Sequence, residues 1–114
     1  AVYDVSSTHP SVLVSEAFRC SHLVFASVTY NGGIFTNMER VLGDLKAHAL
    51  QNRTVALMEN GSWGLIAAKQ MKEIISTMKN MEILEPSLSI KSSLKKGQEA
   101  EIDAIADAIA ASVL

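Results

Sequence analysis

The sequence is poor in cysteine and has no excess of basic charge. Cys20 is the single cysteine and cannot form an internal disulfide, which favours a reducing compartment and a cytoplasmic protein. The formal net charge is -2 at pH 7, so the chain offers no basic surface that could neutralise phosphate groups. We therefore expect neither nucleic acid nor a membrane as a partner. We also expect neither a signal peptide nor a transmembrane helix, since no apolar run approaches the roughly 18 residues of a membrane span.

The sequence also lacks the residue spacing of a metal site and of a hydrolase nucleophile. His9, His22 and His48 lie on different predicted elements and lack the spacing of metal ligands, so we expect no metal site. The segment Gly61-Ser62-Trp63-Gly64 lacks the G-x-S-x-G spacing of a nucleophile elbow. No catalytic residue is therefore expected in this chain.

What the sequence does contain is a regular alternation of strand and helix patterns. Hydrophobic residues make up 48% of 114 residues, enough for the core of one domain over residues 1–114. We predict strands at 2–5, 23–28 and 54–58, two pieces of an edge strand at 83–84 and 88–90, and helices at about 10–20, 35–50, 66–78 and 98–113. This order predicts a three-layer α/β/α sandwich around a parallel sheet of about four strands.

The segment from Leu23 to Gly33 is the one around which the chain is organised. Its first six residues are almost all apolar, the pattern of a strand buried on both faces of a parallel sheet. Its tail then contains Thr29, Tyr30, Asn31, Gly32 and a second glycine. Because ligands in open α/β sheets bind beyond the carboxyl ends of the strands, this tail is predicted to line a site.

The next predicted strand ends in a loop of the same composition, with Asn60, Gly61, Ser62 and Trp63. Neighbouring parallel strands point the same way, so both loops should lie at one edge of the sheet and outline a pocket. Glycines admit a close backbone approach, and two aromatic side chains could stack on a flat ring. The alternative is that these are ordinary turn residues and that the two aromatic side chains close the end of the core.

Both loops resemble those of a known family. Residues 27–31 resemble the SPTYN segment, and residues 59–63 resemble the second flavin loop, of the flavodoxin-like domain of A-type flavoproteins, the flavodiiron proteins. The resemblance implies an FMN-binding electron-transfer domain that is joined, in the full-length protein, to a metallo-β-lactamase-like domain whose two irons reduce oxygen or nitric oxide. It also implies a redox donor protein as a partner, and we expect a homo-oligomer.

The motif match assigns the flavin contacts residue by residue. The resemblance implies that one side of the isoalloxazine would contact Thr29, Tyr30, Asn31 and Gly32. It implies that the other side would contact Asn60, Gly61, Ser62 and Trp63. The alternative function is a cofactor-free domain of the same fold that serves in protein interaction or assembly.

The chain departs from the family pattern in two places. Val28 replaces the proline of the first motif, and the family's first strand and phosphate-binding loop have no counterpart. Four buried side chains of that central strand would contribute roughly 6 to 12 kcal/mol, which is comparable to the stability of a whole domain. The chain begins without Met, and we expect it to be a fragment of a longer protein. Otherwise another chain fills the gap, or the strand at 2–5 moves in beside the strand at 23–28 and brings residues 6–8 near the place of the phosphate loop.

Glu59 adds a further expectation. A carboxylate beside a flavin disfavours added negative charge and so would lower the reduction potential of the flavin. The alternative is a solvated glutamate at the end of a strand.

Overall fold

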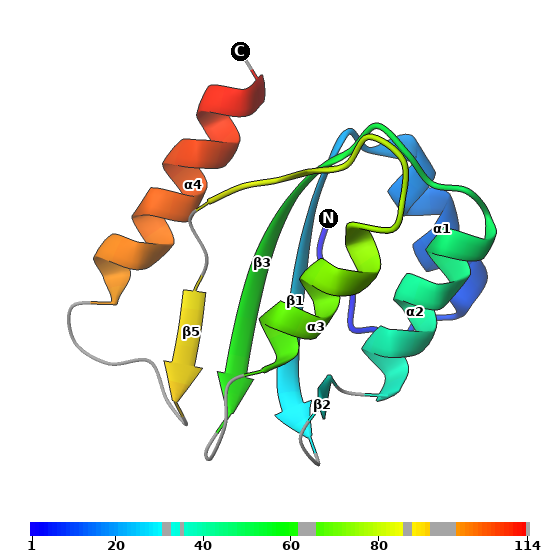
Figure 1. Cartoon of the computed structure of the whole chain (residues 1–114), viewed down its shortest axis with the longest axis horizontal. Helices are drawn as coiled ribbons and strands as arrows, with labels where there is room; N and C mark the ends of the chain where they lie inside the picture. The colour runs from blue at the N-terminus through cyan, green and yellow to red at the C-terminus, as the bar shows by residue number, and fades with distance from the viewer. Residues whose placement is uncertain (31–32, 35, 62–65, 86–87, 92–97, 114) are drawn as a thin grey trace.

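The structure is a computed structural model that describes residues 1–30, 33–34, 36–61, 66–85, 88–91 and 98–113. Figure 1 shows the elements in chain order around a central sheet. They are α1 (Pro10–Arg19), β1 (His22–Tyr30), β2 (Gly33–Ile34), α2 (Thr36–Ala47), β3 (Thr54–Gly61), α3 (Ala67–Ile75), β4 (Glu82–Ile83), β5 (Leu88–Lys91) and α4 (Glu99–Val113).

The sheet has the order β2-β1-β3-β4. β5 also pairs with β3, further along the same edge that β4 occupies. β1 and β3 are parallel, from His22 opposite Thr54 to Val28 opposite Asn60. β4 pairs with the start of β3 and β5 with its end, so together they form the interrupted edge strand that the sequence predicts. The four strands β1, β3, β4 and β5 are parallel, and only β2, which folds back on β1 as a hairpin, is antiparallel. A largely parallel sheet of about four strands is confirmed, with the strands at 23–28 and 54–58 and the interrupted edge strand in it.

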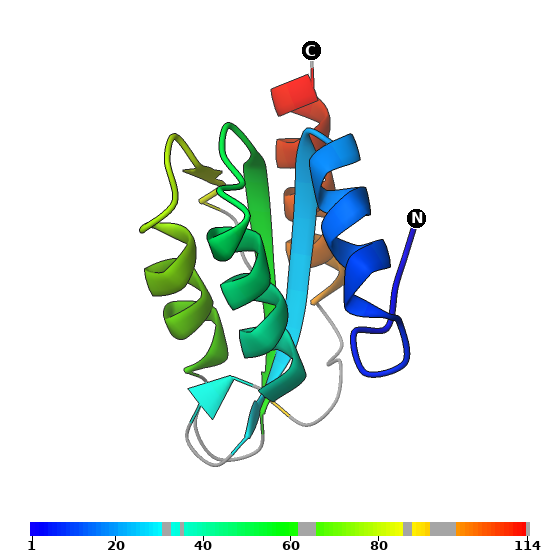
Figure 2. The same cartoon turned by 90° about the vertical axis from the view of Figure 1, so that its right-hand side faces the viewer.

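The helices form two outer layers. Figure 2 shows α2 and α3 on one side of β1 and β3 and α4 on the other, which confirms the three-layer architecture. α1 lies beside α2, and the three helices α1, α2 and α3 share the larger core cluster with β1 and β3. α4 packs through Ile105 on a smaller cluster with Ala56 and Leu88.

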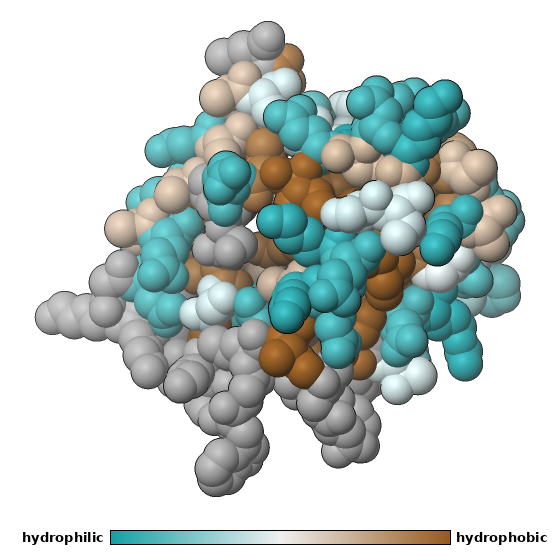
Figure 3. All heavy atoms as spheres, in the orientation of Figure 1, coloured by the Kyte–Doolittle hydropathy of each residue, from teal (hydrophilic) through white to brown (hydrophobic). Residues whose placement is uncertain are grey.

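The periodicity of α2 explains how the larger cluster forms. Met38, Val41, Leu42 and Leu45 are spaced to share one helix face, and all four are buried. Leu42 and Leu45 are 0% and 1% exposed, and burying each contributes about 1.5 to 3 kcal/mol. In Figure 3 the outward surfaces of α2 and α3 carry largely hydrophilic side chains.

The predicted strand at 2–5 is wrong, because residues 1–4 pair with no described strand and a local turn follows at 4–8. Both the amide and the hydroxyl of Ser6 donate to Oδ1 of Asp4, at 2.9 and 2.7 Å. The amides of Ser7 and Thr8 donate to the Asp4 carbonyl. An aspartate that bonds the backbone two residues on makes a turn, so the chain reverses here instead of extending. α1 is then capped by Nδ1 of His9, not by a hydroxyl.

The expectation that β1 is buried on both faces is also wrong. Phe25 faces α1 to α3 and is buried, whereas Val24 and Val28 are 50% and 46% exposed. α4 packs mainly on β3 and β5 and meets β1 at its start, where Ser112 contacts His22, so Val24 and Val28 stay exposed. Beyond that start, one face of β1 therefore lacks a helix within the described part of the chain.

Candidate functional site

The structure brings the described parts of the two predicted loops to one edge of the sheet. β1 ends at Tyr30 and β3 ends at Gly61, and the register of Val28 opposite Asn60 makes these ends adjacent. Thr29 and Tyr30 pair with Ile34 and Gly33 in the β1–β2 hairpin. Of the eight predicted site residues, Asn31, Gly32, Ser62 and Trp63 lie outside the described residues.

Glu59 is the buried charged residue at this edge, with 8% of its surface exposed. Its Oε1 accepts a hydrogen bond from the amide of Ala68 in the first turn of α3, at 3.3 Å. Its Oε2 accepts from the hydroxyl of Ser89 in β5, at 2.8 Å. Ser27, Glu59 and Ser89 occupy matching positions on three neighbouring strands. The alternative of a solvated glutamate is wrong, because the carboxylate is held inside the fold.

The β1–β2 hairpin is attached to the same helix. The amide of Ile34 donates to Oε1 of Gln70 in α3, at 2.9 Å. Sequence reasoning places Gln70 on this helix but assigns no role to Gln70 or Ser89. The sequence signal for Gln70 was that it is a polar residue within a helical stretch rich in Met and Ile.

A shallow hollow of about 230 Å³ lies over β1, β3 and β5 near the carboxyl ends of these strands. Ala26, Val28, Met58, Asn60 and Ile90 line it together with Ser27 and Glu59, and its accessible surface is almost wholly apolar. Because side chains alternate along a strand, the side chains of the first five residues belong to the sheet face opposite that of Glu59. A flat apolar ring is the kind of ligand that such a surface suits.

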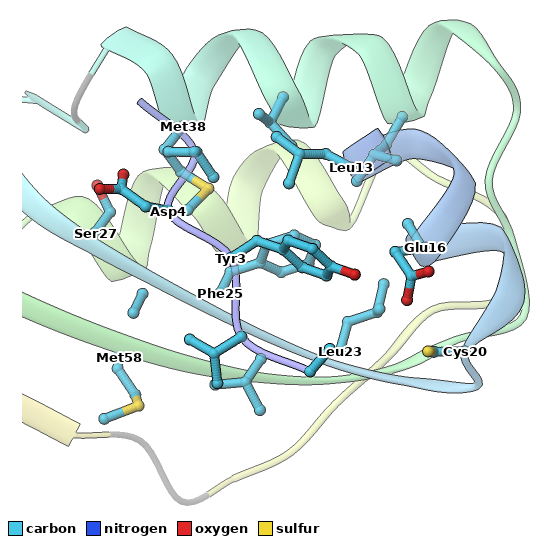
Figure 4. Close-up of a pocket in the computed structure, with 18 of the residues that line it drawn as sticks. Tyr3, Asp4, Leu13, Glu16, Cys20, Leu23, Phe25, Ser27, Met38 and Met58 are labelled. Carbon is cyan, nitrogen blue, oxygen red and sulfur yellow. The ribbon is translucent and has the colours of Figure 1, made fainter. Parts of the chain in front are cut away.

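A larger cavity of about 780 Å³ runs along β1. Its walls come from residues 1–5, from β1, and from α1 and α2, as Figure 4 shows. Within the described residues, β1 from His22 to Ala26 pairs with β3 on one side only. The cavity therefore lies beside an open strand edge, where the sequence predicts a missing strand. Residues 1–5 line it and residues 1–4 form no strand, so the alternative in which the strand at 2–5 moves in beside β1 is not seen.

The turn before α1 does not fit a phosphate group. The Ser6 hydroxyl donates to Asp4 Oδ1, and the Ser7 hydroxyl is 3.5 Å from the Asp4 carbonyl. The side-chain and backbone hydrogen bonds from Ser6 lower the pKa of Asp4, so this carboxyl stays ionised at neutral pH. Asp4 and Ser27 both line the large cavity, so an ionised carboxylate lies in the wall of the cavity that runs along β1.

His22 makes hydrogen bonds that connect parts of the fold. The two ring nitrogens of His22 lie 2.7 Å from the Ser21 hydroxyl and 3.0 Å from the Ser112 hydroxyl, which links β1 to the end of α4. Among the described residues, no three His, Cys, Asp or Glu side chains are grouped as metal ligands would be. In the same part of the chain, no helix has both the length and the apolar character of a membrane span.

No family model matches this sequence, and a search of curated proteins found no match by sequence. Solved structures do match the fold. The Flv1 flavodiiron core from Synechocystis sp. PCC6803 superposes with a TM-score of 0.76 at 14% identity, over 95% of this chain and 28% of that one. Rubredoxin oxygen:oxidoreductase from Desulfovibrio gigas gives 0.74 at 16% identity, over 90% of this chain and 32% of that one.

Flavodoxins match over more of their own length. A flavodoxin from the domain Archaea superposes with a TM-score of 0.69 at 20% identity, over 91% of this chain and 71% of that one. At these identities the likeness concerns the fold, and the predicted flavodoxin-like fold is confirmed. The chain spans less than a third of the length of the two flavodiiron structures.

Proposed function

We propose that this chain is an FMN-binding electron-transfer domain of a flavodiiron-type oxidoreductase. The observation that carries the proposal is the parallel register of β1 and β3, which brings the ends of both strands, each followed in the sequence by residues of matching composition, to one carboxyl edge of a flavodoxin-like sheet. Ligands of open α/β sheets bind at this edge. The apolar hollow near the two strand ends supports a flat ring as the ligand.

The proposal assigns the ring contacts to the predicted residues. The β1 side is Thr29, Tyr30, Asn31 and Gly32, and the β3 side is Asn60, Gly61, Ser62 and Trp63. Bound FMN would supply reversible electron transfer, while the chain orients the ring and limits its access to water. The proposal covers the ring and assigns no residue to the phosphate, because the turn at Asp4 does not fit a phosphate group.

The partners follow from the same proposal. A diiron metallo-β-lactamase-like domain would receive the electrons and reduce oxygen or nitric oxide, and a redox donor protein would supply them. The full-length protein would be a cytoplasmic homo-oligomer. Alone, the chain would carry electrons without turning over either gas.

A flavin titration tests the proposal. Flavin fluorescence should be quenched on binding, and Trp63 is the only tryptophan, so its own emission gives a second signal. Trp63→Leu and Tyr30→Leu should each weaken FMN binding by roughly two- to twelvefold through lost ring stacking. Phe18→Leu is the matched control, since Phe18 is an exposed aromatic residue on α1 that contacts Arg53. Unquenched flavin at saturating protein would disprove the proposal.

A second function is favoured by the open edge of β1. A cofactor-free domain for protein interaction or assembly would use the exposed Val24 and Val28 and the neighbouring cavity. The absorption spectrum separates the two functions. A yellow protein that retains flavin supports the electron-transfer function. A colourless protein that also does not bind added FMN supports the interaction or assembly function.

A further inference from the structure

Both strand ends of the candidate site are attached to the first two turns of α3. The Glu59 carboxylate connects β3 to the amide of Ala68, and the Gln70 side chain connects Ile34 of the hairpin to the same helix. Ser89 extends the first connection to β5. Four separate elements, β2, β3, β5 and α3, are therefore joined through the side chains of Glu59, Gln70 and Ser89.

The hydrogen bond between Glu59 and Ala68 joins the two residues that flank the segment 60–67. Glu59 is the last residue before Asn60 and Gly61, and Ala68 is the second residue of α3. This hydrogen bond fixes the position of the end of β3 relative to the first turn of α3. Because the carboxylate is 8% exposed, water competes little for this bond.

The Gln70 connection does the same for the other strand end. Ile34 follows the β1–β2 turn and is itself buried, at 6% exposed. Its amide is a donor, so the Gln70 atom that meets it must be the carbonyl oxygen. The hairpin is thereby held at a fixed distance from α3, and through α3 from the end of β3.

We infer that Glu59 and Gln70 are positioning residues that use α3 to hold the β1–β2 hairpin and the start of α3 in place beside the end of β3, and so position the backbone that leads into the two flavin-binding loops. The inference rests on the proposed function for its ligand. It assigns Glu59 a role through geometry, whereas the sequence suggested a role through charge beside the flavin.

Conservative and disruptive variants separate these two roles. In Glu59→Gln the amide oxygen can still accept from Ala68, and the amide nitrogen can donate to the Ser89 hydroxyl, which is free to rotate. In Glu59→Ala both partners lose their acceptor. We expect Glu59→Ala to weaken FMN binding about tenfold or more and Glu59→Gln to stay within about threefold of the unmodified chain. Glu73→Gln, an exposed glutamate on the same helix, is the control for removing one negative charge.

Gln70 is tested in the same way. Gln70→Met keeps the size of the side chain but cannot accept from the Ile34 amide, whereas Gln70→Glu keeps an acceptor oxygen. Hydrogen exchange of the Ile34 amide in the flavin-free protein should accelerate about tenfold in Gln70→Met and little in Gln70→Glu. The Ala68 amide should respond likewise in Glu59→Ala and Glu59→Gln.

The two kinds of measurement keep this inference distinct from the proposed function. If the unmodified chain binds no FMN, the proposed function fails, while the exchange rates still show whether Glu59 and Gln70 hold the strand ends. Unchanged exchange at Ala68 and Ile34 in the disruptive variants overturns the inference. So does a Glu59→Gln variant that loses FMN as completely as Glu59→Ala, because charge would then be the cause. A reduction potential that shifts in Glu59→Gln with unchanged affinity would confirm positioning and add a separate effect of charge.

Discussion

Val28 of β1 lies opposite Asn60 of β3 in the parallel ladder. This pair is the last one of the ladder, and it lies where the polar ends that the sequence singles out begin, with Asn60 on β3 and Thr29 next on β1. Had the strands been antiparallel or shifted, the two loops would lie apart and no common site could form. The register of the sheet, more than any single side chain, is therefore what makes a ring site at this edge possible.

The first prediction concerns the phosphate of the ligand. Because Ser6 donates to Asp4 and the Asp4 carboxylate is ionised, the chain should bind riboflavin at least as well as FMN. Asp4→Asn should favour FMN over riboflavin by roughly two- to fivefold at low salt, since it removes a repulsive charge. Parallel titrations with the two flavins measure the ratio. Asp103→Asn, an exposed carboxylate on α4, should leave the ratio unchanged. A strong preference of the unmodified chain for FMN would contradict the prediction.

The second prediction concerns pH and the turn at Asp4. Its pKa lies below the ordinary value of 3.8 because of the hydrogen bonds from Ser6. A lowered pKa in the folded state means that the turn is stabilised above pH 3.8 and loses this stabilisation as the pH falls through the folded pKa. The amide shift of Ser6 in NMR spectra should stay constant from pH 7 to pH 5 and titrate with a midpoint below 3.8. A midpoint at or above 3.8 would show that the bonds do not form.

The third prediction contrasts two apolar side chains. Leu42 is fully buried between α2 and the sheet, and Leu42→Ala should lower the free energy of unfolding by about 2 to 5 kcal/mol. Val24 is 50% exposed on β1, and Val24→Ala should cost less than about 1 kcal/mol. Urea unfolding of the two variants gives both values. Equal losses would mean that another molecule covers Val24 in solution.

The fourth prediction concerns Arg53, which binds the carbonyl groups at the end of α1. Its Nε donates to the Ala17 carbonyl at 3.2 Å and its Nη2 to the Phe18 carbonyl at 3.1 Å. Nη1 also donates to the Gln51 carbonyl at 2.6 Å. A lysine cannot reproduce this planar set of donors, so Arg53→Lys should cost about 1 to 2 kcal/mol in thermal or urea unfolding. Arg40→Lys on the exposed side of α2 is the control and should be neutral.

The predictable part of the fold is the part governed by local periodicity. Four apolar residues of α2 at helical spacing predict the face that is buried, and all four are buried. The apolar runs at 23–28 and 54–58 mark β1 and β3, and the polar residues that follow mark the edge where the strands end together. These features need no knowledge of distant residues.

The unpredictable part depends on contacts that a single segment does not encode. Val24 has the same sequence character as a buried strand residue, but its exposure is decided by where α4 packs. The segment at 2–5 looks like a strand until Asp4 bonds to Ser6. The role of Gln70 appears only once Ile34, 36 positions earlier, is folded against α3.

The open edge of β1 also bears on how the isolated chain behaves in the test tube. Unpaired backbone groups on an edge strand are a template to which a strand of another molecule can add. Exposed valines beside that edge make such lateral addition more favourable. Self-association should therefore rise with protein concentration, and a lysine in place of Val24 should improve solubility by making edge-to-edge stacking unfavourable.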